Sequence, residues 1–403
     1  MAHLTLRPGK DKDLFHGYPW VFANQIAATE GEPQTGDVVT LATHSGAALG
    51  RGFYHATSRI AFRFLTRDLD VSIDGAFWQG RLAQALALRA HLFDPQTHYR
   101  LVYSESDGFP GTLIDRYDQV YTFTTLCAGM DQRRDEILDA LDSLVRPAAV
   151  VERNDHPLRA RDELPERQGL LRGTYAGSVQ IQEAGVLYEV DVLHGLKTGF
   201  FLDQREHRQW VRRLAWDKRV LDVFCADGGF GLQAAAGRAK SVHFVDSSAA
   251  VLERAAHNAT LSGLAGDHLH FERADALEYL GDLVTEHQRY DLIILDPPAF
   301  AKSRMHVEDA LRAYQRINIS ALQLLAPGGI LATGSCSQAV EEAEFYRLLR
   351  YCARKANVRL RWLHRGYHPP DHPVLEQMPE THYLKFAIVQ VLPDDFLPGR
   401  PGG

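Results

Sequence analysis

The pattern of apolar and polar positions in the first part of the chain is that of short strands. Apolar residues alternate with polar ones in RIAFRFLTR, and the segments DVVTLAT and AALGRGFY are separated by a Ser45-Gly46 turn. Alternation with a period of two is typical of a strand that buries one face. The pattern predicts a small β-rich domain over residues 1–68.

Helical spacing appears next and is followed by further strands. In AFWQGRLAQALALRAHLF the apolar residues recur near every third or fourth position, and DQRRDEILDALDSLV shows the same period. The run LVYSESDGFPGTLIDRYDQVYTFTT between them reads as two strands around a Gly/Pro turn. We therefore expect an α+β central domain over residues 69–177. The polar stretch HPLRARDELPERQGLLRG, broken by Pro157 and Pro165, is predicted to be a connecting loop or a boundary.

From residue 178 the chain alternates strands with helices. VQIQEAGVLYEVDV reads as a hairpin, and the strands RVLDVF, SVHFVD, HLHFERAD, DLIILD and GILATGS are separated by helical segments. A βαβα order predicts an α/β fold with a doubly wound, Rossmann-like parallel sheet. We assign it residues 178–395 and expect a tail at 396–403.

Composition narrows the class of protein without naming a function. The chain has 45% hydrophobic and 24% charged residues and no apolar run near the ~18 residues that cross a bilayer. The first residues lack the apolar core of a secretory signal, and the four cysteines are scattered, which favours a reducing cytoplasm. The net charge is −7, but residues 1–67 carry +2, a weak indication of nucleic-acid binding in that segment.

The turn CADGGFG after the strand RVLDVF is the first candidate site. Gly228 and Gly229 let the backbone approach a bound nucleotide, and Asp246 ends the next strand where an acid accepts hydrogen bonds from ribose hydroxyls. Asp275 follows the third strand at the same edge. A dinucleotide is the competing ligand, but there is no GxGxxG, and Asp222 just before the turn would repel a pyrophosphate. An acid there suits a cationic ligand, so S-adenosylmethionine is the expected cofactor.

Four motifs in this order resemble the class I S-adenosylmethionine-dependent methyltransferases: LDVFCADGGFG, FVDSS, RADA and LDPPAF. The resemblance implies that Asp222 and Gly228 face the amino-acid moiety of the donor. It also implies that Asp246 holds the ribose and Asp275 the adenine.

A second resemblance covers nearly the whole chain. LKTGFFLDQREHR is similar to the signature of RlmI-type enzymes, which methylate C5 of a cytosine in large-subunit ribosomal RNA. PGKDKDLFHGYPWVFANQI resembles their N-terminal PUA domain, SESDGFPGTLIDRY their central domain and DHPVLEQMPETHYLK their closing segment. This family implies ribosomal RNA as the partner, a homodimer, and Lys197 and Gln204 as residues of a lid over the donor. We expect no metal.

The resemblance also supplies the reacting groups. C5 of cytosine is a poor nucleophile, and a thiolate that adds to C6 makes C5 reactive. Cys336 follows the strand GILATGS and occupies the position of the family's cysteine, while Gly334 stands where relatives often carry a second one. Asp296 of LDPPAF is expected to face the target base. Phe300 is expected to stack on an extruded base and Lys302 to meet a phosphate.

Two other functions stay open from the residues. A DPP motif beside an aromatic residue also occurs in enzymes that methylate a nitrogen, so a guanine or adenine nitrogen of ribosomal RNA is an alternative acceptor that needs no covalent cysteine. The other is an RNA-binding or ribosome-assembly module that keeps the cofactor fold without turnover. Loss of methyl transfer on replacing Cys336 would separate the first alternative from cytosine-5 methylation.

Overall fold

A computed structural model of the chain describes residues 2–94, 97–300 and 307–393. The chain forms two compact units, and each is built from three separate segments of the sequence. The first unit contains Met1–Ile181, Val190–Leu202 and Pro370–Thr381. The second contains Gln182–Glu189, Asp203–Pro369 and His382–Gly403. Each unit is described by itself.

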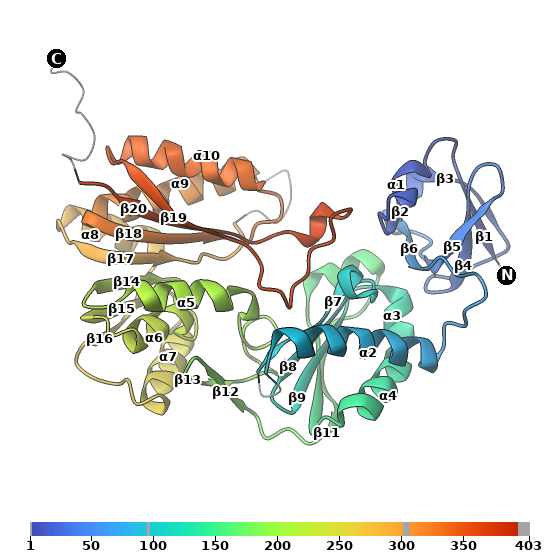
Figure 1. The fold of residues 1–403 in the computed structure, drawn as a ribbon, viewed down its shortest axis with the longest axis horizontal. Coiled ribbons are helices and arrows are strands. Elements are labelled where there is room, and N and C mark those ends of the chain that lie inside the picture. The colour runs from blue at the N-terminus through green and yellow to red at the C-terminus, as the bar shows by residue number, and fades with distance from the viewer. Residues whose placement is uncertain (1, 95–96, 301–306, 394–403) are drawn as a thin grey trace, which may run out of the picture. The chain divides into compact units, whose positions relative to one another are not determined.

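The N-terminal part of the first unit is a six-stranded sheet (Figure 1). Its strands, in the spatial order β2-β6-β5-β4-β1-β3, are β2 Trp20–Phe22, β6 Ile60–Thr66, β5 Ala48–Tyr54, β4 Val38–Ala42, β1 His3–Leu6 and β3 Ile26–Glu30. The strands bury one apolar face, and Gly52 allows β5 to approach β6, because a Cβ there would lie 2.2 Å from the carbonyl oxygen of Arg63. The predicted β-rich domain is confirmed.

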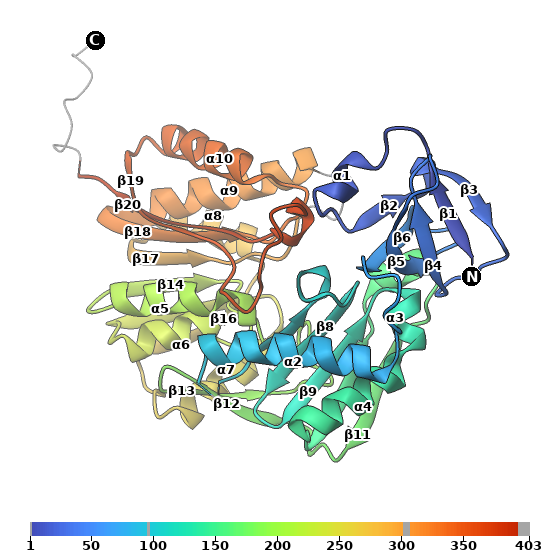
Figure 2. The same cartoon turned by 45° about the vertical axis from the view of Figure 1, so that its right-hand side comes forward.

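A five-stranded sheet with helices follows in the same unit. The strand order is β11-β10-β9-β8-β7, with β11 Arg167–Gly173, β10 Ala149–Asn154, β9 Val120–Thr125, β8 Thr112–Tyr117 and β7 Tyr99–Tyr103. Helices α2 (Gly75–Leu92) and α4 (Arg134–Val145) pack side by side against it (Figure 2), and the short α3 (Ala128–Gln132) precedes α4. The predicted connecting segment contains a short 3-10 helix at Pro157–Asp162, but the loop prediction was wrong for Arg167–Gly173, which pairs with β10 as an edge strand. The sequence RQGLLRG shows no alternation of apolar and polar residues, and Leu170 is exposed, so the strand pattern was not visible.

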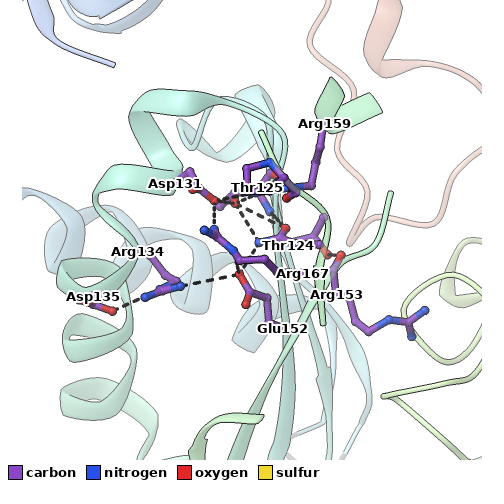
Figure 3. Close-up of polar contacts among 11 residues, drawn as sticks. Thr124, Thr125, Asp131, Arg134, Asp135, Glu152, Arg153, Arg159 and Arg167 are labelled. Atoms are coloured by element: carbon purple, nitrogen blue, oxygen red, sulfur yellow. Dashed lines mark hydrogen bonds and ion pairs between the residues drawn. The ribbon is translucent and has the colours of Figure 1, made fainter. Parts of the chain in front are cut away.

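Charged side chains lie along one end of this central sheet (Figure 3). Asp131 accepts hydrogen bonds from Arg159 at 3.1 Å and from Thr125 Oγ1 at 2.9 Å, and it also pairs with Arg167. Arg167 reaches Glu152 at 3.2 Å. The arginine side chains lower the pKa of Asp131 against the effect of burial. The network therefore satisfies buried charges and holds the end of β9 to β11.

The N-terminal sheet packs on the central domain through both apolar and polar contacts. Phe53 shares an apolar cluster with Trp78 of α2, and their rings stack with centroids 6.4 Å apart. Glu105 accepts hydrogen bonds from Trp20 Nε1 at 2.7 Å and from Arg63 at 3.0 Å. The first unit is thus held together by a buried ion pair as well as by its core.

The second unit contains a seven-stranded sheet of the expected α/β type. Its order is β16-β15-β14-β17-β18-β20-β19, with β16 Leu269–Arg273, β15 Ser241–Asp246, β14 Arg219–Val223, β17 Tyr290–Leu295, β18 Leu325–Ser335, β20 Lys385–Val391 and β19 Leu360–Gly366. Strands β14 to β18 are parallel to one another, and β20 is antiparallel to both of its neighbours. The strand order reverses next to β14, and ligands bind at such a switch point outside the carboxyl ends of the strands. The Rossmann-like fold is confirmed.

Helices cover both faces of this sheet (Figure 1). One face carries α5 Arg205–Leu214, α6 Gly229–Ala236 and α7 Ala249–Leu261, and the other carries α8 Ala276–Thr285, α9 Val307–Leu324 and α10 Glu342–Lys355. The buried strands between them are nearly continuous in apolar residues, as expected of a parallel sheet. The predicted hairpin is also present, as β12 Val179–Glu183 and β13 Val186–Val190. No helix within the described ranges is both long and apolar enough to cross a membrane.

Candidate active site

The turn between β14 and α6 is shaped by three left-handed residues. Phe224, Ala226 and Gly228 have φ values of 64°, 47° and 84°. A Cβ on Gly228 would lie 3.1 Å from both Ala255 and Leu232, so the turn packs tightly against its own helices. Gly229 begins α6, and its carbonyl oxygen accepts a hydrogen bond from the hydroxyl of Tyr188 at 3.2 Å. The backbone is therefore held in one conformation at the carboxyl edge of the sheet.

Asp222 lies completely buried directly before this turn. Its Oδ2 accepts a hydrogen bond from the backbone N–H of Gly231 at 2.7 Å, which ties β14 to the first turn of α6. Among the described residues its Oδ1 has no hydrogen-bond partner. Burial raises the pKa of this carboxyl well above its usual range, and the carboxylates of Asp296 and Asp246 add to the effect. A buried carboxyl whose ionised form is disfavoured, and whose Oδ1 has no donor among the described residues, would gain from a cationic group beside it.

Asp246 and Asp275 occupy the ends of the next two strands. Asp246 accepts hydrogen bonds from Ala226 N at 3.2 Å and from Ser248 N at 3.0 Å, so it joins the turn to the end of β15. Its oxygens keep lone pairs that can accept further hydrogen bonds, such as those of ribose hydroxyls. Asp275 is exposed and caps α8 by accepting from Leu277 N at 2.9 Å. That role is structural, and its expected contact with adenine stays a prediction.

These residues fit S-adenosylmethionine. The orphaned Oδ1 of Asp222 suits the ammonium group of the donor, and the turn offers backbone rather than side chains at Gly228 and Gly229. Asp246 lies at the strand end next to the turn, where the ribose of a bound nucleotide is held in this fold. In the described part of the chain, no group of three histidine, cysteine or acidic side chains could hold a metal ion.

Cys336 and Asp296 are brought together at the ends of neighbouring strands. Asp296 follows β17, Cys336 follows β18, and the two strands are parallel partners. The Sγ of Cys336 lies 3.8 Å from the carbonyl oxygen of Pro297, the residue after Asp296. A Cβ at Gly334 would lie 3.3 Å from Oδ1 of Asp296. Of the four cysteines, Cys336 is partly exposed and the others are buried, so its thiol is the accessible one.

Gln204 makes a contact that the sequence did not predict. Its side-chain amide donates a hydrogen bond to Oδ1 of Asp296 at 2.8 Å. Its Oε1 accepts a hydrogen bond from Nδ1 of His207 at 2.6 Å, and both side chains are buried. Burial lowers the pKa of His207 to about 3, so the ring is neutral, with its proton on Nδ1. His207 therefore orients the amide of Gln204, and Gln204 in turn orients Asp296.

His207 is itself fixed by packing. Its ring stacks on Phe386 of β20, with centroids 4.2 Å apart and planes 6° apart. Sequence reasoning missed this residue, although its spacing of three from Gln204 places both on one side of a helical turn. That spacing was the signal that could have found it.

The structure shows other contacts for the remaining predicted residues. Lys197 belongs to the first unit, has a left-handed φ of 51°, and places its ammonium 4.4 Å from the ring centroid of Phe201. Phe300 packs on Tyr314 and Phe224, with centroids 4.8 and 6.3 Å away. That packing occupies part of the ring, and its stacking on a base stays a prediction. Lys302 lies outside the described residues.

The fold and this edge of the sheet define a Rossmann-like methyltransferase domain. Residues 143–386 match the family model of S-adenosylmethionine-dependent methyltransferases, and residues 4–67 match that of a PUA-like domain. The chain is 39% identical to the ribosomal RNA large subunit methyltransferase I of Shewanella denitrificans, over 96% of this chain and 99% of the relative. It is 38% identical to the protein of the same name from Pseudoalteromonas atlantica, over 97% and 100%.

The chain belongs to the ribosomal RNA large subunit methyltransferase I family of S-adenosylmethionine-dependent methyltransferases. Its cofactor is S-adenosylmethionine. The fold agrees with a solved structure of a methyltransferase candidate complexed with SAH, with a TM-score of 0.84 and 23% identity over 97% of this chain and 100% of the other. The expected family, cofactor and PUA-like domain are confirmed.

Proposed function

We propose that this protein methylates C5 of a cytosine in large-subunit ribosomal RNA through a covalent adduct with Cys336. The observation that carries the proposal is the position of the partly exposed thiol of Cys336 and of Asp296 at the ends of two neighbouring parallel strands, at the edge that carries the donor turn. The names of the relatives, which specify ribosomal RNA of the large subunit, support the choice of substrate.

The residues have distinct roles in this reaction. The thiolate of Cys336 forms a bond from Sγ to C6 of the base, and the electron pair of the C5–C6 double bond becomes available at C5. Asp296, held by Gln204, faces the base and donates a proton to N3 when it is protonated. S-adenosylmethionine, when bound, supplies a sulfonium methyl group. After C5 has been methylated, its proton leaves to water and the C5–C6 double bond forms again as the bond to Sγ breaks. Cys336 then leaves as a thiolate, and N3 returns its proton to Asp296.

The donor is held by a separate set of residues. Asp222 places a buried anionic oxygen toward the ammonium group, and Asp246 accepts from the ribose hydroxyls. Gly228 and Gly229 let the backbone follow the ligand. Replacing Cys336 is therefore expected to leave donor binding unchanged.

The test is Cys336→Ala in the full-length protein, with tritium-labelled S-adenosylmethionine and large-subunit ribosomal RNA that lacks the modification. We expect no transfer of label and an unchanged affinity for S-adenosylmethionine in a calorimetric titration. Cys352→Ala is the matched control, because Cys352 is buried in α10 and burial raises the pKa of its thiol to about 12. Full transfer by Cys336→Ala would exclude the covalent mechanism and favour a nitrogen acceptor.

A further inference from the structure

Lys385 is a buried cation next to the proposed nucleophile. It is the first residue of β20, is 2% exposed, and is the cross-strand partner of Ser335, the residue before Cys336. Its ammonium donates hydrogen bonds to the carbonyl oxygens of Ser337 at 2.7 Å and Tyr383 at 2.8 Å. Lys385 thus contacts the chain on both sides of Cys336.

The two groups that accept hydrogen bonds from this ammonium are neutral, so they do not balance its positive charge. Two carbonyl oxygens accept hydrogen bonds from it but carry no net charge, and burying an uncompensated cation is unfavourable. Burial lowers the pKa of Lys385 to about 8, while the charges of Cys336 and Glu342 act in the opposite direction. The side chain is therefore still largely protonated at neutral pH and would gain from a nearby anion.

We propose that the ammonium of Lys385 stabilises the thiolate of Cys336 and so prepares the nucleophile of the methylation reaction. The inference rests on the proposed function in assigning a purpose to that thiolate. The proton of the thiol leaves to water and Lys385 keeps its own, so the product is one ammonium and one thiolate. Lys385 acts through Cys336 and is a positioning residue.

Other groups around Cys336 do not provide this stabilisation. The hydroxyl of Tyr314 in α9 is hydrogen-bonded to the hydroxyls of Ser335 and Ser337, each at 3.0 Å. Burial raises the pKa of Tyr314 to about 12, so this side chain stays neutral. The carboxyl groups of Asp296 in the neighbouring loop and of Glu342 in α10 disfavour a further anion nearby when they are ionised. Lys385 opposes them from β20.

The test measures the reactivity of Cys336 directly, in the full-length protein without RNA or donor. Iodoacetamide modifies the thiolate, and the fraction modified at Cys336 is read by peptide mass across a pH series. Cys127, Cys225 and Cys352 are internal controls, because burial raises the pKa of each thiol. The wild-type rate should reach half its plateau below the ordinary cysteine pKa of about 8.5.

Lys385→Met is expected to move that midpoint upward by about one pH unit or more, with a roughly tenfold slower reaction at neutral pH. Lys385→Arg should preserve the wild-type profile. Lys385→Gln keeps a donor for the carbonyl oxygens and removes the charge, so it should behave as Lys385→Met and serves if the methionine variant does not fold. The plateau rate at high pH should be the same in all of them, because it reports access to the thiol.

Two results would overturn the inference: an unchanged midpoint in Lys385→Met and Lys385→Gln, or a changed plateau with no change of midpoint, which indicates a structural role. The experiment is separable from the proposed function. If Cys336→Ala still transfers methyl groups while the midpoint moves as expected, the covalent mechanism fails and the ion pair stands.

Discussion

At the scale of single residues, the site separates donor binding from the chemistry at the base. Asp222 lies in β14 just before the turn, and Asp246 ends β15 beside it. Asp296 and Cys336 instead follow β17 and β18. The buried charge of Asp222 is costly in the absence of a ligand, because one of its oxygens has no partner among the described residues. Such a cost is expected at a site that binds a cation.

Asp222→Asn is expected to stabilise the unliganded protein and to weaken donor binding. The amide removes a buried charge whose pKa is raised by burial, so the free energy of unfolding should rise by about 1 kcal/mol. It also points an N–H group toward the ammonium of the donor, and the affinity should fall by roughly tenfold. Chemical denaturation and calorimetric titration measure the two effects.

The raised pKa of Asp222 predicts that the stability of the fold decreases as the pH rises. A carboxyl with a raised pKa stabilises the fold at low pH, and this contribution is lost as the pH rises through the raised value. Wild-type stability should therefore decline more steeply over that range than that of Asp222→Asn. Parallel pH profiles of the two proteins would contradict the assignment of the charge to Asp222.

Gln204→Leu tests whether Gln204 orients Asp296, as its hydrogen bond indicates, or forms a lid over the donor, as expected from the sequence. The leucine side chain cannot donate to Asp296, so methyl transfer should slow by about tenfold or more. The affinity for S-adenosylmethionine should stay within about twofold, since the residue contacts Asp296 rather than the donor turn. A large loss of donor affinity with normal turnover would instead support a lid over the donor.

Among the helices and strands, the sequence predicts those features that depend on hydrophobic periodicity and on residues adjacent in the chain. The βα order from residue 178 and the acids that follow strands were predictable, because apolar runs and turn glycines mark strand ends. The edge strand β11 was not, because its sequence RQGLLRG shows no alternation of apolar and polar residues. The contacts of Gln204 with Asp296 and of Lys385 with Ser337 depend on tertiary pairing of distant segments, which no local pattern contains.

Helix α5 carries a further element-scale prediction through His207. Burial lowers the pKa of this ring to about 3, below the value of an unfolded histidine, so the stability it contributes is present above about pH 6.5 and is lost as the pH falls toward 3. His207→Gln should show a smaller loss of the free energy of unfolding between about pH 7 and about pH 4.5. Urea denaturation at the two pH values measures it, and an equal loss in both proteins would show that His207 is not the group that titrates.

At the scale of the whole molecule, the chain combines a PUA-like domain, a central α+β part and a methyltransferase domain. The boundaries at 68 and 177 stay predictions. The first compact unit contains both the N-terminal sheet and the central sheet, joined by Glu105, Arg63 and Trp20. These contacts indicate that the two parts unfold together.

Glu105→Gln tests this coupling. The side chains of Glu105 and Arg63 are 5% and 11% exposed, and breaking a buried ion pair costs about 3 kcal/mol. We expect the first unit to lose about that much stability, with the fluorescence of Trp20 and the circular dichroism of the central helices changing in one transition. Separate transitions for the two signals in the wild type would contradict a shared unfolding unit.

The covalent mechanism proposed above makes 5-methylcytidine in large-subunit ribosomal RNA the expected product. The most direct measurement incubates the full-length protein with S-adenosylmethionine and unmodified ribosomal RNA, digests the RNA to nucleosides and identifies the methylated one by mass and retention. We expect 5-methylcytidine with the wild-type protein and none with Cys336→Ala. A methylated guanosine or adenosine, or 5-methylcytidine formed equally by Cys336→Ala, would contradict it.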